Sequence, residues 1–126
     1  MKVKPNNLVM QQLSKYSACC AISSVTLHEL SFGIERLPEG RRKTRLLAYL
    51  STVVQASLPI IEYDPAAALF HSKARLSRQQ LGRPLHFADG QIAGTALAQQ
   101  LTLVTANTKD FELIAGLQLE NWHCLT

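Results

Sequence analysis

Apolar residues recur along the chain in two patterns, which predict helices and short buried strands in alternation. Residues 5–17 and 25–37 carry apolar side chains at helical spacing, and the short apolar run 18–22 lies between them. Ser23 or Ser24 can cap the second helix, because a serine hydroxyl accepts a hydrogen bond from a free backbone N–H group. The chain is therefore predicted to begin with a helix, a buried strand and a second helix.

The same alternation continues to the end of the chain. Asp64 followed by Pro65 is typical of a helix start, because aspartate caps the first turn and proline fits it. Helices are predicted at 41–55, 65–81 and 111–115, and strands at 58–63, 101–105 and 117–120. A further helix is predicted from the apolar stripe of Ile92, Ala93, Ala96 and Leu97. Counted from the strand at 18–22, the order is βααβααβαβ, which predicts an α/β fold with a mostly parallel sheet covered by helices on both faces.

Length and composition indicate one globular domain over residues 1–126. A chain of 126 residues is long enough for a single core and too short for two ordinary ones. The hydrophobic fraction of 47% and the charged fraction of 17% exclude a disordered or low-complexity chain. The formal net charge of +4 suits an anionic partner, although charge alone does not identify one.

The cellular setting can also be predicted from the sequence. Apolar runs are only a handful of residues long, whereas about 18 are needed to span a bilayer. The three cysteines, Cys19, Cys20 and Cys124, do not suit a disulfide framework. We therefore expect a cytoplasmic protein with no membrane partner.

Three acidic side chains follow, or lie on helices that follow, predicted strands. Glu29 lies one turn into the helix after the strand at 18–22, Asp110 follows the strand at 101–105, and Asp89 falls on the apolar stripe of its helix. The carboxyl ends of parallel strands share one edge of a sheet, so we expect these carboxylates to converge. Close carboxylates repel one another, and a divalent cation relieves that repulsion; oxygen ligands without Cys or His suit Mg²⁺ or Mn²⁺.

Each acid also has an ordinary structural interpretation. Asp89 and Asp110 are typical of helix caps and first turns, where a carboxylate is stabilised by the helix dipole. Glu29 is also compatible with a plain helical glutamate. Only their convergence favours a metal site.

Three segments, 23–33, 87–93 and 103–111, resemble in order and spacing the PIN-domain ribonucleases of the VapC toxin type. The resemblance runs from about residue 4 to residue 122. It implies a PIN-like three-layer α/β fold with a mostly parallel central sheet. It also implies Mg²⁺- or Mn²⁺-dependent RNA cleavage in a type II toxin-antitoxin system, with tRNA as one candidate substrate, a cognate VapB-type antitoxin and a homodimer.

The resemblance also assigns roles to individual residues. Glu29, Asp89 and Asp110 match the second, third and fourth acidic positions of the family and are the predicted metal ligands and catalytic residues. Thr105 and Asn107 match the polar residues that surround these positions in the family. The resemblance thus implies an endoribonuclease in which a metal-activated water attacks the phosphodiester.

One departure from the family concerns the N-terminus. Members open with a central strand that carries the first acidic ligand, and no Asp or Glu precedes Glu29 here. Two interpretations follow: the true start lies upstream, or the chain is truncated. The alternative function is a catalytically impaired PIN-like domain that retains only antitoxin binding or dimerisation.

Basic residues gather in two places, and both are candidates for RNA binding. Arg41, Arg42, Lys43 and Arg45 form the densest cluster. His71, Arg75 and Arg78 are expected to share one helical face. A solvated helical surface is the alternative in both cases, because runs of Lys and Arg commonly only face water.

Overall fold

The computed structural model of the protein describes residues 21–55, 58–105 and 107–120. These residues fall into two compact units, an N-terminal unit that ends at Ile61 and a C-terminal unit that begins at Glu62. The predicted helix at 5–17, most of the strand at 18–22 and the question of the N-terminal central strand lie outside the described residues. The assignment of residues 1–126 to a single domain stays a prediction.

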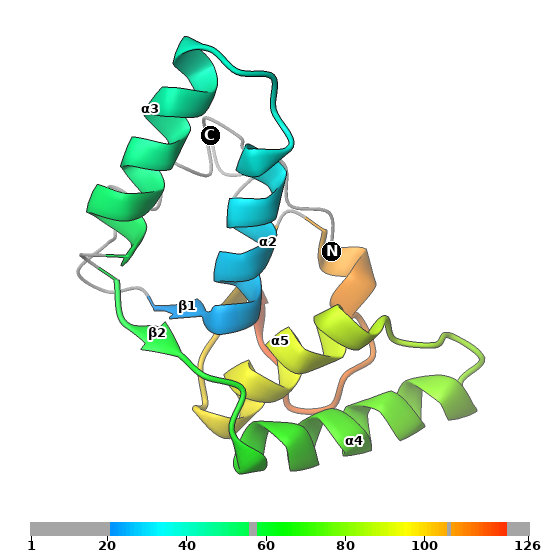
Figure 1. Ribbon diagram of the computed structural model, residues 1–126. Coiled ribbons are helices and arrows are strands. Elements are labelled where there is room, and N and C mark those ends of the chain that lie inside the picture. The colour runs from blue at the N-terminus through cyan, green and yellow to red at the C-terminus, as the bar shows by residue number, and fades with distance from the viewer. Residues whose placement is uncertain (1–20, 56–57, 106, 121–126) are drawn as a thin grey trace. The chain divides into compact units, whose positions relative to one another are not determined.

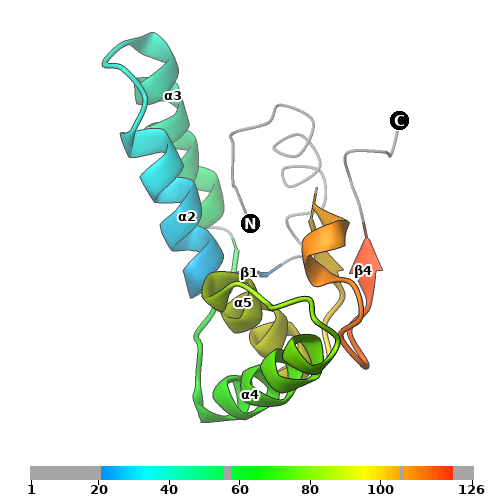
Figure 2. The same ribbon diagram turned by 90° about the vertical axis from the view of Figure 1, so that its right-hand side faces the viewer.

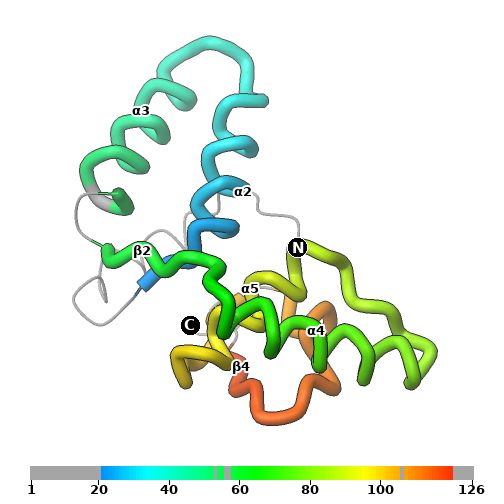
Figure 3. The backbone as a smooth tube through the Cα atoms, turned by 60° about the horizontal axis from the view of Figure 1, so that its bottom comes forward, coloured from blue at the N-terminus to red at the C-terminus, as the bar shows by residue number. Residues whose placement is uncertain are grey.

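The N-terminal unit is a helical hairpin that is preceded by one short strand and followed by another, and the two strands pair with each other. Its elements in chain order are β1 (Ile22–Ser23), α2 (Ser24–Glu35), α3 (Arg41–Tyr49), the π-helical turn η2 (Leu50–Gln55) and β2 (Ile60–Ile61). Strand β1 pairs with β2 in parallel, with Ile22 opposite Ile60. Helices α2 and α3 lie side by side, as Figures 1 and 3 show.

Capping and burial explain why α2 forms where it does. The hydroxyl of Ser23 accepts a hydrogen bond of 2.9 Å from the backbone N–H of Thr26, which satisfies one free donor of the first turn. The apolar stripe of the helix turns toward the core of this unit, where Ile34 is buried. The buried members of that core are Ile22, Ile34, Leu50, Val54 and Leu58.

The C-terminal unit consists of two packed helices and a second parallel strand pair (Figure 2). Its elements are α4 (Pro65–Gln80), α5 (Phe87–Ala98), β3 (Leu103–Val104), the 3₁₀ turn η3 (Thr108–Phe111) and β4 (Leu119–Glu120). The Asp64 carboxylate caps α4 by accepting a hydrogen bond of 2.8 Å from the N–H of Ala67. Strand β3 pairs with β4 in parallel, with Leu103 opposite Leu119.

Helices α4 and α5 pack unusually closely because α5 carries glycine at the contact. A Cβ atom on Gly90 would overlap the imidazole of His71, and one on Gly94 would overlap the backbone oxygen of Ala67. The two glycines therefore permit an approach that a larger residue would prevent. This close contact places the first turn of α5 directly against the side chain of His71.

The order of helices and parallel strands predicted from the sequence is confirmed for the described residues, with two local corrections. The predicted helix at 41–55 is α-helical only as far as Tyr49 and continues as a π-helical turn. The short helix predicted at 111–115 is wrong, because the helical turn is 3₁₀ and lies at Thr108–Phe111. Phe111 and Ile114 are both buried, which produces a helix-like spacing, but the chain passes between them through Leu113 at a φ of 64°.

In the described ranges of the chain, no helix combines the length and the apolar character that a membrane crossing requires.

Candidate functional site

Asp89 is a buried carboxylate in the first turn of α5. Its relative exposure is 0%, and Gly90, Ile92 and Ala93 beside it are also buried. The prediction that this side chain lies on the inward stripe of the helix is therefore confirmed. A buried carboxylate is costly unless it is compensated, and the partial positive charge of the α5 N-terminus contributes to that compensation.

Asp110 lies in η3, on the loop that leaves the carboxyl end of β3. A chain of hydrogen bonds folds this loop: the hydroxyl of Thr105 accepts from the N–H of Asn107 at 3.1 Å, and the carbonyl oxygen of Asn107 accepts from the N–H of Asp110 at 3.1 Å. The N–H of Thr105 in turn donates to the carbonyl oxygen of Glu120 at 3.0 Å. Thr105 and Asn107 thus shape the loop that presents Asp110, and η3 packs against α5.

Arg78 on α4 holds this loop through hydrogen bonds. The sequence interpretation had assigned Arg78 to an exposed basic face, which its burial contradicts. Its Nε donates to the carbonyl oxygen of Arg83 at 2.7 Å, and its Nη1 donates to the carbonyl oxygens of Asp110 and Glu112, both at 3.1 Å. The relative exposure of Arg78 is only 5%, so its guanidinium is not part of a surface for phosphates.

The predicted basic face of His71, Arg75 and Arg78 is therefore corrected. His71 and Arg78 are buried, and Arg75 is exposed, with its guanidinium carbon 5.7 Å from the centre of the Phe87 ring. The sequence does contain a signal for this burial, namely the spacing of His71 and Arg78 relative to the two small alanines on α4. Ala67, His71, Ala74 and Arg78 follow one another at four, three and four residues, which is the period of a single buried stripe.

His71 is enclosed between α4, α5 and the segment before α4. Its Nδ1 lies 2.7 Å from the hydroxyl of Tyr63, and its ring meets the rings of Tyr63 and Phe87 edge to face, with ring centres 5.8 Å and 4.9 Å away. Within the described residues, its buried Nε2 has no hydrogen-bond partner. Burial, and secondarily the positive charge of Arg75, lower the pKa of His71 from its ordinary value.

The three predicted acidic ligands are divided between the two units. Asp89 and Asp110 belong to the C-terminal unit, and the partly buried Glu29 belongs to α2 of the N-terminal unit. Across the described parts of the chain, no three His, Cys, Asp or Glu side chains form a group that could hold a metal ion. The convergence of Glu29 with the two aspartates stays a prediction.

The donors that the C-terminal unit supplies nevertheless fit a hard divalent cation. Asp89 and Asp110 offer only oxygen atoms, and such ligands suit Mg²⁺ or Mn²⁺. Asp110 is partly buried, and among the described residues its carboxylate forms no ion pair with a Lys or Arg. Asp110 can therefore serve as a ligand without first breaking an ion pair with a described Lys or Arg.

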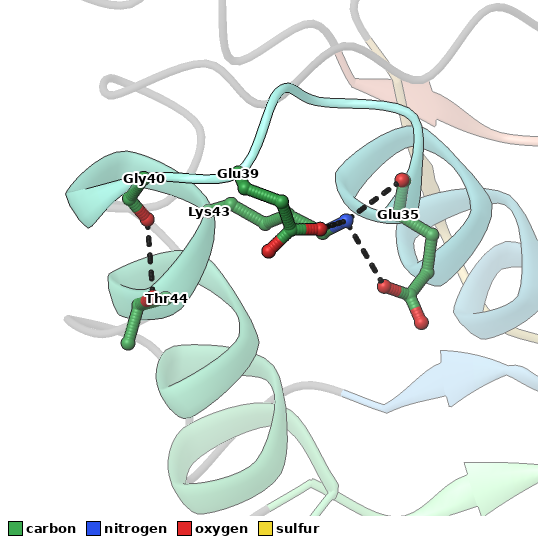
Figure 4. Close-up of polar contacts among 5 residues, drawn as sticks. All are labelled: Glu35, Glu39, Gly40, Lys43 and Thr44. Atoms are coloured by element: carbon green, nitrogen blue, oxygen red, sulfur yellow. Dashed lines mark hydrogen bonds and ion pairs between the residues drawn. The ribbon is translucent and has the colours of Figure 1, made fainter.

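The basic cluster on α3 contains two kinds of residue. Arg41, Arg42 and Arg45 are exposed. Lys43 is held by the preceding turn, because its Nζ lies 2.8 Å from Oε1 of Glu39 and 3.1 Å from the carbonyl oxygen of Glu35 (Figure 4). The hydrogen bond that Lys43 donates to Glu39 is the main reason that the pKa of Lys43 is raised. Lys43 is therefore a structural link between α2 and α3, and only the arginines remain free candidates for phosphate binding.

Comparison with known proteins identifies the family. The model of the PIN domain matches residues 5–117, which is most of the chain. The chain belongs to the PIN-domain family. The resemblance of its three motifs to PIN domains of the VapC type is thereby confirmed.

Individual PIN-domain relatives match over nearly the whole chain. A "tRNA(fMet)-specific endonuclease VapC" of Shigella flexneri is 36% identical over 97% of this chain and 89% of that protein. The crystal structure of DNA-bound VapBC from Salmonella typhimurium aligns with a TM-score of 0.75 at 30% identity, covering 93% of this chain and 86% of that chain. The structure of FitAcB from Neisseria gonorrhoeae aligns with a TM-score of 0.76 at 26% identity, covering 97% and 89%.

Proposed function

We propose that this PIN domain is the toxin of a VapBC-type toxin-antitoxin system and cleaves RNA with the help of Mg²⁺ or Mn²⁺. The observation that carries the proposal is the buried Asp89 at the start of α5, in a chain whose relative from Shigella flexneri is named a tRNA endonuclease. Asp89 lies in the first turn of α5, and α5 packs against the turn that carries Asp110. Aspartate side chains that only cap a helix are mostly exposed, so the complete burial of Asp89 favours a role in cation binding.

Individual residues of the chain have distinct roles in this proposal. Asp89 and Asp110 hold the ion, and Glu29 keeps the ligand role that the family resemblance implies. A bound divalent cation lowers the pKa of a water molecule and offsets the charge of the phosphodiester. Thr105 and Asn107 keep the Asp110 turn in shape through their backbone hydrogen bonds. The exposed side chains of Arg41, Arg42, Arg45 and Arg75 bind phosphates of the RNA.

The partners follow from the relatives. The structures of the Salmonella typhimurium relative and of a Rickettsia felis relative at 28% identity are VapBC complexes, so we infer a VapB-type antitoxin for this chain, together with a homodimer and a cytoplasmic site of action. The RNA is proposed to be a tRNA, as the name of the Shigella flexneri relative indicates for that protein.

The alternative function is a catalytically impaired domain that only binds antitoxin or a second copy. Metal binding by the purified protein separates the two functions, because an impaired domain would bind antitoxin but not the ion.

The proposed activity is tested with the full chain, purified after release from its antitoxin, on total tRNA with and without Mn²⁺. We expect cleavage that requires Mn²⁺ and that Asp89→Asn reduces at least about 100-fold, because removal of one ligand charge weakens a cation that depends on few protein ligands. Glu62→Gln, which removes an exposed carboxylate of the same unit, serves as the matched control and should cleave like the unaltered protein. Equal cleavage by Asp89→Asn and the unaltered protein contradicts the proposal.

A further inference from the structure

Arg78 is a buried cation whose described partners are all backbone carbonyl oxygens. They belong to Arg83 in the turn after α4 and to Asp110 and Glu112 around η3. Asp110 is 32 residues and Glu112 is 34 residues from Arg78 in the sequence. A single guanidinium thus connects the end of α4 to the turn that carries Asp110.

We propose that Arg78 is a positioning residue that fixes the Asp110 carboxylate for the divalent cation, an inference that rests on the proposed function. The carbonyl oxygen that Nη1 binds belongs to Asp110 itself, and the second carbonyl, that of Glu112, lies on the other side of the buried Phe111. Arg78 therefore clamps the backbone on both sides of Phe111 and restricts the position from which the Asp110 side chain projects.

The short turn that carries Asp110 gains from such a clamp. A 3₁₀ turn has poorer hydrogen-bond geometry than an α-helix, and η3 is only 4 residues long. Apart from the Arg78 bonds, the Asp110 backbone is held by the hydrogen bond of its N–H to Asn107, and the exposed ion pair of Glu112 with Arg83, at 3.6 Å, adds little. Arg78 and the buried side chain of Phe111 thus together hold the turn that carries Asp110.

The chemistry of the side chain matches the task. A guanidinium is planar and carries five N–H donors in a fixed arrangement, so it can bind three carbonyl oxygens from two loops at once. A lysine ammonium has the same charge but is a flexible point donor that cannot reproduce this geometry. Arg78→Lys therefore separates the effect of geometry from the effect of charge.

The test measures Mn²⁺ binding by calorimetry in the absence of RNA, alongside the Mn²⁺ dependence of RNA cleavage. We expect Arg78→Lys and Arg78→Met to raise the Kd for Mn²⁺ by about 10-fold, because supporting residues of metal ligands have effects of this size. Cleavage at saturating Mn²⁺ should stay within about threefold of the unaltered protein, because the clamp acts on the placement of the ligand and not on the RNA. Lys73→Met, which removes an exposed charge from the same helix, should leave the Kd for Mn²⁺ unchanged.

A double-variant cycle distinguishes positioning from general stability. In an Asp110→Asn background, Arg78→Lys should cause no further loss of Mn²⁺ affinity, because the carboxylate that it positions is already gone. Independent, additive losses overturn the inference, as does an Arg78→Lys protein that melts at a lower temperature but binds Mn²⁺ with the original Kd. If the unaltered protein neither binds Mn²⁺ nor cleaves RNA, the proposed function itself fails; if it does both and Arg78 has no effect on the Kd, the inference about Arg78 alone fails.

Discussion

At the scale of single residues, burial separates polar side chains that look alike in the sequence. Arg75 and Arg78 lie less than one helical turn apart on α4, yet one is exposed and the other is enclosed by carbonyl oxygens. The inward position of Asp89 was predictable, because its neighbours on the helix are apolar. The partners of Arg78 were not predictable, because they are backbone atoms more than thirty residues away and leave no pattern in the side-chain sequence.

The buried imidazole of His71 gives the protein a pH-dependent stability. Its pKa is lowered below the ordinary 6.5 by burial and by Arg75, so the unfolded chain binds a proton more readily than the folded protein. The free energy of unfolding should therefore be fully retained above about pH 6.5 and should fall as the pH decreases, by at most about 1.4 kcal/mol for each pH unit. Urea unfolding between pH 5 and pH 7.5 measures this slope.

His71→Gln should flatten that slope, whereas the exposed His86→Gln serves as the control and should keep it. The interpretation of His71 is wrong if the slope is the same in the unaltered protein and in His71→Gln.

At the scale of elements, the predicted helices and strands follow from periodicity, and the deviations occur where tertiary contacts decide. The helix at α4 begins where Asp64 and Pro65 indicate, because the cap is a local interaction. The 3₁₀ turn at Thr108–Phe111 was misplaced, since the spacing of Phe111 and Ile114 reflects two inward contacts and not a helix. Local signals were therefore sufficient for the starts of α2 and α4 and insufficient for the loop that carries Asp110.

The close contact of α4 with α5 predicts a large effect of one added methyl group. Gly90→Ala places a Cβ inside the ring of His71, and that ring is already bounded by Tyr63 and Phe87. We expect a loss of about 1–3 kcal/mol in the free energy of unfolding from overpacking, which exceeds the gain of up to about 1 kcal/mol in helix propensity. Chemical denaturation measures the change.

The double variant His71→Ala with Gly90→Ala should lose less stability than the sum of the two single variants, because the smaller side chain at 71 makes room for the methyl group. A Gly90→Ala protein as stable as the unaltered one would show that the His71 ring or the helices can shift without cost.

At the scale of the whole molecule, the α/β class was predicted from the alternation of helices and strands and the family from three short motifs, and the matches over most of the chain confirm both. The convergence of the three acidic residues, in contrast, stays a prediction. Glu29 lies in one unit and the two aspartates in the other, and ligands brought together from distant segments leave no local signal in the sequence. The sequence therefore predicts which oxygen ligands are available, but it does not predict whether they lie close together.

The exposed arginines of α3 predict a salt-dependent affinity for RNA. Replacing Arg41, Arg42 and Arg45 together by Gln should weaken tRNA binding and reduce the steepness with which binding falls as salt increases, because fewer counterions are released. Binding of labelled tRNA to a cleavage-deficient Asp89→Asn protein, measured from low to moderate salt, provides both quantities. Lys43→Gln should change the slope less, since its ammonium is already held by Glu35 and Glu39. An unchanged slope in the triple variant excludes α3 from the RNA contact.

The parallel pairing of β1 with β2 also says how the helical hairpin is attached. Because Ile22 lies opposite Ile60, the polypeptide enters and leaves the α2–α3 region at neighbouring points, about 5 Å apart across the strand pair. The α2–α3 region is thus an insertion that begins and ends at the β1–β2 pair. A hairpin from a related protein could be exchanged at the β1–β2 pair without lengthening the chain, which would make this pair a suitable junction for chimaeric proteins.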